Sequence, residues 1–244
     1  MDVNIPYGKK EITISINEPV EVLFPKKIKT INENKVIKES LEKPIDMETF
    51  EQFAEKSDKL LIIVNDATRP TPTSKILEYL SHILLSHPHV TFIVATGVHR
   101  PPTDEELKYI FGKTYNSFKN QIIAHNARNE EDMVYLGTSK NGTEMYINKI
   151  VTEYKNVLVI GSVEPHYFAG FTGGRKSFLP GVASYKTIEM NHKLALSDKA
   201  CSLALKDNPV HEDMVDAMNV LKNIKVFSIQ TILTGDHKVY AVTT

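Results

Sequence analysis

The stretch LLIIVND at residues 60–66 decides the fold class. Five apolar side chains run without alternation into a polar turn, which is typical of a strand that is buried on both faces of a sheet. Residues 90–95 (VTFIVA) and 157–160 (VLVI) have the same form. Helical patterns separate these runs, so the sequence predicts an α/β fold with a doubly wound, mostly parallel, Rossmann-like sheet flanked by helices.

The remaining elements follow from hydrophobic periodicity and from capping residues. Asp46 or Glu48 is expected to open the first helix, and Thr103 and Asn208 are good N-caps for two later ones. The sequence predicts early strands at 11–16 and 20–23, helices at 46–56, 74–86, 104–111, 184–196 and 209–221, and a further strand region at 224–233.

The composition excludes several functional classes. The chain has 244 residues, 41% hydrophobic and 24% charged, with a formal net charge of −1. Its lysines and arginines are scattered, so we expect no nucleic-acid partner. The N-terminus lacks the apolar core of a signal peptide, and no apolar run approaches the ~20 residues that cross a bilayer, so we expect a cytoplasmic protein without a membrane partner. Cys201 is the single cysteine and excludes an internal disulfide.

Polar clusters follow the three apolar runs. They are Asp66–Pro70, Thr96–Pro101, and Glu164–His166, the last of which leads into Gly170–Lys176. In an open α/β sheet, ligands bind in the crevice outside the carboxyl ends of the strands. If the three runs are neighbouring strands, these clusters converge on one edge of the sheet.

The residues in these clusters suit the chemistry of a small anionic substrate. The planar fork of Arg69 fits a carboxylate, and His99 and His166 can serve as acid and base near neutral pH. The Gly173-Gly174 pair allows close approach to a phosphate-bearing ligand. The spacing of a P-loop is absent around Lys176, so ATP binding is not favoured.

Each of these residues also has a purely structural explanation. Asp66 could cap the following helix, Arg69 could form a surface ion pair, and each histidine could be a satisfied structural residue. The Gly173-Gly174 pair could be only a tight turn. Their coincidence at three strand ends favours a functional site over four separate structural roles.

The chain resembles the lactate racemase family. The matching strings are DATRPTP (Asp66–Pro72), ATGVHRPPTDEEL (Ala95–Leu107) and EPHYFAGFTGGRKSFLPGVASYKTIEMNH (Glu164–His192). Weaker matches lie in NIPYGKKEITISI near the N-terminus and in NPVHEDMVDA at Asn208–Ala217, so the resemblance covers essentially the whole chain.

The resemblance implies a racemase of 2-hydroxy acids, with lactate as the favoured substrate, that uses nickel held in a pincer-shaped nucleotide (pyridinium-3-thioamide-5-thiocarboxylic acid mononucleotide). This nickel-pincer nucleotide would be tethered to Lys176, with His192 as the nickel ligand and Gly173, Gly174 and Arg175 around it. His99 and His166 would form the acid–base pair, and Arg69 and Asp66 would bind and orient the substrate. Racemisation would proceed by proton-coupled hydride transfer to and from the cofactor, and cofactor-synthesis proteins would be partners.

The resemblance also implies a domain organisation. It identifies residues 1–244 as the N-terminal catalytic domain of a two-domain protein, without the C-terminal domain that closes over the cofactor. Lid closure often completes such sites, so we expect the 244-residue chain by itself to be inactive or weakly active.

Two alternatives from other functional classes remain open on the sequence. In the first, Asp66, His99 and His166 bind zinc directly in a metal-dependent hydrolase. In the second, the chain is a non-enzymatic sensor that binds a nucleotide through the Gly173-Gly174 loop and Arg69.

Overall fold

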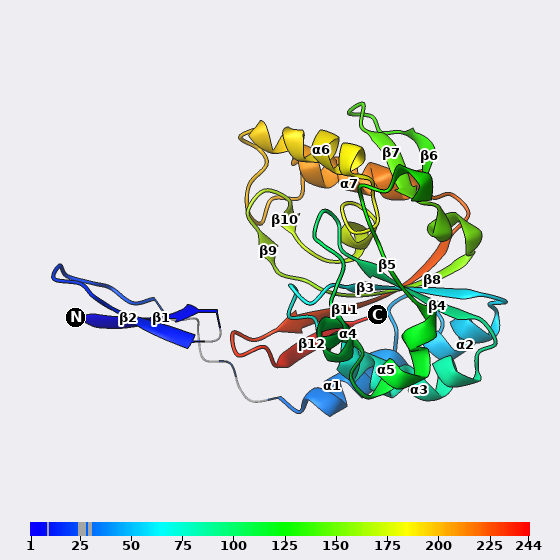
Figure 1. The fold of residues 1–244 in the computed structure, drawn as a ribbon, viewed down its shortest axis with the longest axis horizontal. Coiled ribbons are helices and arrows are strands. Elements are labelled where there is room, and N and C mark those ends of the chain that lie inside the picture. The colour runs from blue at the N-terminus through cyan, green and yellow to red at the C-terminus, as the bar shows by residue number, and fades with distance from the viewer. Residues whose placement is uncertain (9, 24–27, 29–30) are drawn as a thin grey trace. The chain divides into compact units, whose positions relative to one another are not determined.

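Alternate side chains of strand β3 (Leu60–Asn65) enter two separate hydrophobic cores, one on each face of a six-stranded sheet. Figure 1 shows the strands of this sheet with helices above and below them. The first, third and fifth residues of β3 join one core, and the second and fourth join the other. All five are completely buried. This double burial is the physical reason for an apolar run without alternation.

The computed structural model describes residues 1–8, 10–23, 28 and 31–244. The chain divides into two compact units, Met1–Thr30 and Ile31–Thr244. The first contains the antiparallel hairpin β1 (Asp2–Tyr7) and β2 (Lys10–Ser15). The second contains the sheet and the other elements.

The sheet of the larger unit has the strand order β12-β11-β8-β3-β4-β5, and all neighbours are parallel except the edge pair β11–β12. The chain runs outward from β3 through β4 to β5 and then returns to the other side of β3 with β8. The order therefore reverses between β3 and β8, where open α/β sheets bind ligands. Besides β3, the strands are β4 (Val90–Ala95), β5 (Ile122–Ala124), β8 (Asn156–Ser162), β11 (Lys225–Leu233) and β12 (Val239–Thr243).

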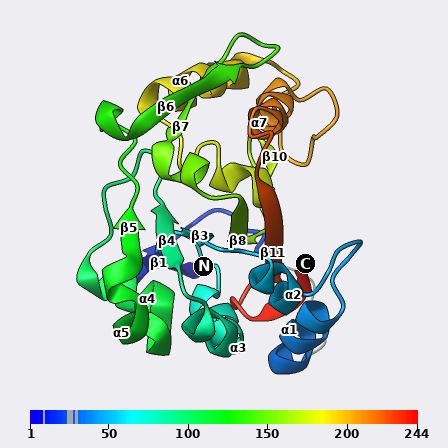
Figure 2. The same ribbon diagram turned by 90° about the vertical axis from the view of Figure 1, so that its right-hand side faces the viewer.

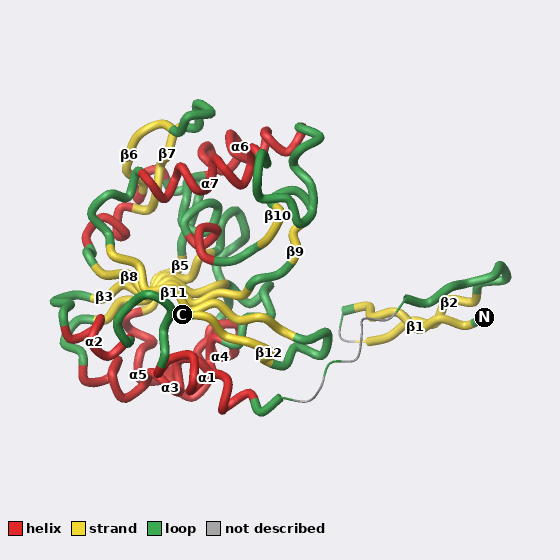
Figure 3. The backbone as a smooth tube through the Cα atoms, turned by 180° about the vertical axis from the view of Figure 1, so that it is seen from behind, coloured by secondary structure: helices red, strands yellow, loops and turns green. Residues whose placement is uncertain are grey.

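Helices cover both faces of the sheet, and Figures 2 and 3 show the strands between two groups of helices. One face carries α1 (Glu33–Glu42), α2 (Phe50–Glu55), α3 (Thr73–Ser86), α4 (Asp104–Phe111) and α5 (Tyr115–Phe118). The other carries α6 (Tyr185–Lys193), α7 (Pro209–Asn219) and the hairpin of β6 (Met133–Thr138) and β7 (Glu144–Asn148). A short hairpin, β9 (Pro165–His166) and β10 (Gly170–Phe171), follows β8. In the described part of the chain, none of the helices is long and apolar enough to cross a bilayer.

The predicted fold class is confirmed, and strand β4 and helix α4 have the predicted bounds. Thr103 caps α4 and Asn208 caps α7, as predicted. The predicted strand at 20–23 is wrong, because β2 pairs with β1 and residues 20–23 are irregular. The predicted helix at 46–56 is shorter, because Thr49 forms a capping box with Gln52 and α2 begins only at Phe50.

Replacing Ile62 by alanine should destabilise the larger unit strongly. The side chain is fully buried at the centre of the sheet, and such truncations cost about 2–5 kcal/mol. Urea denaturation followed by circular dichroism measures the change. Leu85→Ala is the control, because Leu85 is 59% exposed and its truncation should cost at most about 0.5 kcal/mol. Similar losses for the two variants would contradict the described packing.

Candidate active site

A cavity of about 450 Å³ opens at the carboxyl ends of β3, β4 and β8, next to the point where the strand order reverses. The pocket gathers residues from all three predicted clusters and from α6. Seven of the nine predicted site residues line it: Asp66, Arg69, His99, His166, Gly173, Lys176 and His192. Gly174 and Arg175 do not line it. The predicted convergence of the three clusters is therefore present in the structure.

Asp66 orients His99 from the end of β3. Its Oδ2 lies 2.7 Å from Nδ1 of His99, and its Oδ1 accepts hydrogen bonds from the backbone N–H and the hydroxyl of Thr68. The carboxylate is 8% exposed, whereas about half of the His99 side chain is exposed. A carboxylate accepts only, so Nδ1 of His99 carries a proton, and in the neutral ring the lone pair is on Nε2.

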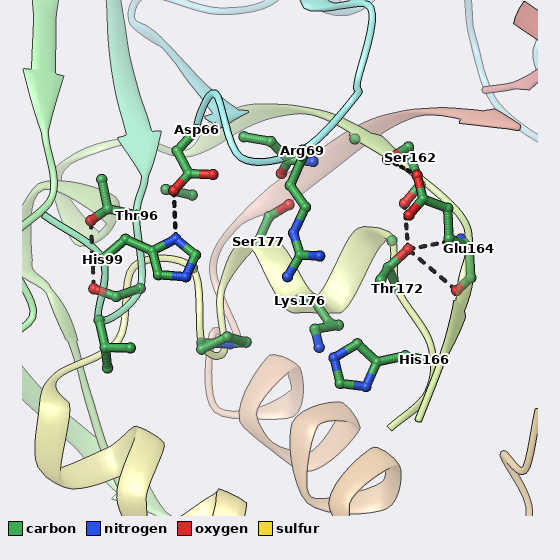
Figure 4. A pocket seen from close by; sticks show the side chains of 18 of the residues that line it. Asp66, Arg69, Thr96, His99, Ser162, Glu164, His166, Thr172, Lys176 and Ser177 are labelled. Carbon is green, nitrogen blue, oxygen red and sulfur yellow. Dashed lines mark hydrogen bonds and ion pairs between the residues drawn. The ribbon is translucent and has the colours of Figure 1, made fainter. Parts of the chain in front are cut away.

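His166 lies across the cavity from His99 in the β9–β10 hairpin, and Figure 4 shows Arg69 and Lys176 between them. Its ring stacks on Tyr167 with centroids 4.8 Å apart, and Nδ1 accepts a hydrogen bond from the backbone N–H of Ala169. Burial, and then the charges of Lys176 and Arg69, lower the pKa of His166 to about 4. The ring is therefore neutral at pH 7.

Two cations face the cavity without a carboxylate partner among the residues that the structure describes: Arg69 and Lys176. Burial, with smaller contributions from the charges of Arg69 and Arg175, lowers the pKa of Lys176 to about 7. Its ammonium lies 5.7 Å from the centroid of the Phe168 ring. Near neutral pH this amine is nucleophilic, and the guanidinium of Arg69 is free to bind an anion.

His192, on α6, lines the same cavity and packs edge-on against Phe168. Its Nδ1 is buried and has no hydrogen-bond partner among the described residues. Burial, followed by the charge of Lys176, lowers the pKa of this histidine. The lowered pKa favours the neutral imidazole, which has one unprotonated nitrogen that can bind a metal.

The loop that carries Lys176 is held by a residue that the sequence did not reveal. Gln230 on β11 is 7% exposed, and its Oε1 accepts from the backbone N–H of Gly174. A Cβ on Gly173, which has φ of +93°, would lie 3.1 Å from this oxygen and 2.8 Å from Val163. Gly173 is therefore needed for close packing against Gln230 of β11 and against Val163, which follows β8.

Arg175 turns away from the cavity and holds the neighbouring hairpin. Its Nη2 donates to the carbonyls of Ala169 and Phe171 at 2.9 and 3.0 Å. Burial lowers its pKa. The guanidinium thus stabilises the turn that follows His166. Its charge also acts on His166 and Lys176, although Arg175 does not line the cavity.

Several other lining residues carry hydroxyl or carboxylate groups that the sequence did not single out. They form one network: the Ser162 hydroxyl lies 3.0 Å from that of Thr71, and the Thr172 hydroxyl donates to the Ser162 carbonyl. The same Thr172 hydroxyl accepts from the backbone N–H of Glu164. Ser162 is the last residue of β8 and Thr172 follows β10, and serine and threonine are too common at strand ends to indicate a site.

The geometry does not favour direct binding of zinc by Asp66, His99 and His166. Across residues 1–8, 10–23, 28 and 31–244, no three His, Cys, Asp or Glu side chains are grouped closely enough to hold a metal ion. Asp66 and His99 form a pair, but His166 lies across the cavity from them. The arrangement therefore does not favour the hydrolase alternative.

Comparison with known proteins gives one consistent result. Residues 7–203 match the family described as lactate racemase N-terminal domain. The lactate racemases of Thermoanaerobacterium thermosaccharolyticum and Lactiplantibacillus plantarum are 33% and 35% identical to the chain over 98% and 97% of its length. The chain spans 58% of the length of each of these relatives.

Solved structures show the same similarity. The lactate racemase apoprotein from T. thermosaccharolyticum superposes with a TM-score of 0.82 at 33% identity, over 100% of this chain and 58% of its own. A protein from Thermotoga maritima superposes with a TM-score of 0.71 at 20% identity, over 87% of this chain and 54% of its own, and supports the fold alone.

Replacing Lys176 by methionine should raise the pKa of His166. At acidic pH the lysine is charged and opposes protonation of the ring, so its removal shifts the pKa upward from about 4. The pKa should stay below the ordinary value of 6.5, because burial remains the largest cause. An NMR titration of the histidine ring nitrogens in the apoprotein measures this change. Lys222→Met, an exposed control, should leave the titration unchanged, and an unshifted midpoint in Lys176→Met would contradict the described charge coupling.

Proposed function

Because the chain belongs to the lactate racemase N-terminal domain family, we propose that it forms the active site of a 2-hydroxyacid racemase whose substrate is lactate. One observation carries this proposal: two histidines face each other across a cavity that also holds an arginine and a lysine (Figure 4). A racemase acts on both faces of one carbon, and two acid–base groups on opposite sides of the substrate meet that need.

Arg69 would bind the substrate carboxylate and hold it while the rest of the molecule turns between the two histidines. A guanidinium forms two parallel hydrogen bonds with a carboxylate, which fixes the plane of the anion. The substrate hydroxyl then faces His99 in one enantiomer and His166 in the other. Nε2 of His99 takes the hydroxyl proton, and the carboxylate of Asp66 at Nδ1 stabilises the resulting imidazolium.

The residues present fit a tethered nickel-pincer nucleotide. Lys176 offers an amine with its pKa lowered to about 7, as a covalent attachment needs, and the neutral imidazole of His192 offers a nitrogen ligand that suits nickel. When bound, the cofactor would supply a reversible hydride acceptor, which avoids forming a carbanion at the substrate carbon. The chain would contribute binding, orientation and proton transfer, the usual share of a protein in cofactor chemistry.

The cofactor part of the proposal is tested by mass spectrometry and nickel analysis. The full-length gene product, produced together with the cofactor-synthesis proteins, should carry added mass on the peptide that contains Lys176 and about one nickel per chain, and should interconvert the lactate enantiomers. Lys176→Arg keeps the charge but has no amine to acylate, so it should lack the added mass. Lys186→Arg, at an exposed ion pair with Glu144, is the matched control and should retain it. An unmodified Lys176 in a protein that racemises lactate would refute the tether.

Arg69→Lys should weaken the use of lactate while leaving the fold intact. It keeps the charge but loses the paired hydrogen bonds, and hydrogen bonds to charged groups are worth about 1.5–3 kcal/mol, or roughly 10- to 150-fold in kcat/KM. Steady-state racemisation kinetics measure this loss. Arg100→Lys is the control, because Arg100 pairs with Glu106 outside the cavity. Equal kinetics for the two variants would show that Arg69 does not bind the carboxylate.

A further inference from the structure

A single peptide unit connects His166 to the start of helix α7. The N–H of Ala169 donates to Nδ1 of His166 at 3.2 Å, and the carbonyl of Phe168 accepts from Nδ2 of Asn208 at 2.8 Å. These two groups belong to the same planar peptide bond. A hydrogen bond that fixes the carbonyl therefore also fixes the direction of the N–H that points at the histidine.

Asn208 is well suited to hold this peptide, because every polar atom of its amide is used. The residue is completely buried. Its Oδ1 caps α7 by accepting from the backbone N–H groups of Val210 and His211, and its Nδ2 donates to the carbonyls of Phe168 and Ala204. Two donors on one side and two acceptors on the other leave only one orientation of the amide.

The bond from Ala169 determines the tautomer of His166. A nitrogen that accepts from a backbone N–H cannot itself carry a proton, so the neutral ring holds its proton on Nε2. Ala169 is completely buried and does not line the cavity, whereas His166 does, so Nε2 is the nitrogen left to face the cavity. Figure 4 shows the ring directed at Lys176.

We propose that Asn208 is a positioning residue for His166, which it holds, through the Phe168–Ala169 peptide, in the tautomer with the proton on Nε2. The opposite arrangement holds at His99, where Asp66 keeps the proton on Nδ1. The cavity thus presents one accepting and one donating ring nitrogen. Asn208 contacts neither cavity nor substrate and acts only through the backbone.

The consequence for the reaction rests on the proposed function. A substrate oxygen that faces His99 meets a lone pair that can take a proton at once. An oxygen that faces His166 meets an N–H and receives a hydrogen bond. His166 becomes a base only when its Nε2 proton is released to solvent and another is taken up at Nδ1, which breaks the bond from Ala169.

The tautomer is read directly from the ring nitrogens of the wild-type apoprotein. In ¹⁵N-labelled protein at pH 7, long-range proton–nitrogen spectra distinguish a protonated from an unprotonated ring nitrogen, and His166→Gln identifies the resonances. We expect Nδ1 of His166 to be unprotonated and Nδ1 of His99 to be protonated. A protonated Nδ1 in His166 would overturn the proposal without any variant.

The role of Asn208 is tested with Asn208→Asp and Asn208→Ser. Both keep an oxygen that can cap α7, and neither has the amide donor for the Phe168 carbonyl. The ratio of the two tautomers should shift by about tenfold toward Nδ1–H, which is the size of one net hydrogen bond. Because aspartate also adds a charge, the neutral serine variant must shift in the same direction.

The matched controls are Asn32→Asp and Asn32→Ser. Asn32 caps α1 with its Oδ1, as Asn208 caps α7, and it makes no contact with the cavity. These variants should leave the His166 nitrogens unchanged. An unchanged tautomer ratio in folded Asn208→Asp and Asn208→Ser would overturn the positioning role. No activity or cofactor enters these measurements, so their outcome is separate from that of the racemase proposal.

Discussion

Parallel pairing of β3 with both β4 and β8 is the constraint on which the site depends. Val64 is paired with Val94 on one side and with Ile160 on the other, so the three strands end together at one edge of the sheet. The order reverses beside β3, so the loops after β4 and β8 diverge and leave space between them. Asp66 and Arg69 follow the central strand, and His99 and His166 follow the strands on either side, which places the two histidines across the cavity from each other.

The electrostatics of the cavity follow from the charged and titratable side chains that these strand ends bring together. Arg69 and Lys176 lie in a partly buried space, and their charges oppose protonation of His166; the charge of Arg69 also opposes protonation of Lys176. An anionic substrate would relieve part of this repulsion, because its carboxylate could pair with these cations. His99 differs because Asp66 stands directly behind it. The surroundings of the two rings therefore favour different tautomers.

The sequence was most reliable where local physics decides the outcome. Strand β4 and helix α4 have the predicted bounds because an unbroken apolar run and a strong N-cap are local signals. The prediction failed at 20–23, which pairs with none of the described strands, and it missed the short strand β5 (Ile122–Ala124), which exists only because β4 pairs with it. Pairing is a property of the folded sheet, so a short stretch of sequence cannot predict it.

The sequence by itself determined the fold class, the family and the set of candidate site residues, because these depend on residue type and order along the chain. Tertiary structure alone decided which of these residues share the cavity and what each nitrogen can do. It turned Arg175 away to brace a hairpin, brought Gln230 against the glycine loop, and set Asn208 behind His166. The physical reason is that hydrogen-bond direction and burial, which fix protonation and tautomer, arise only when distant segments pack together.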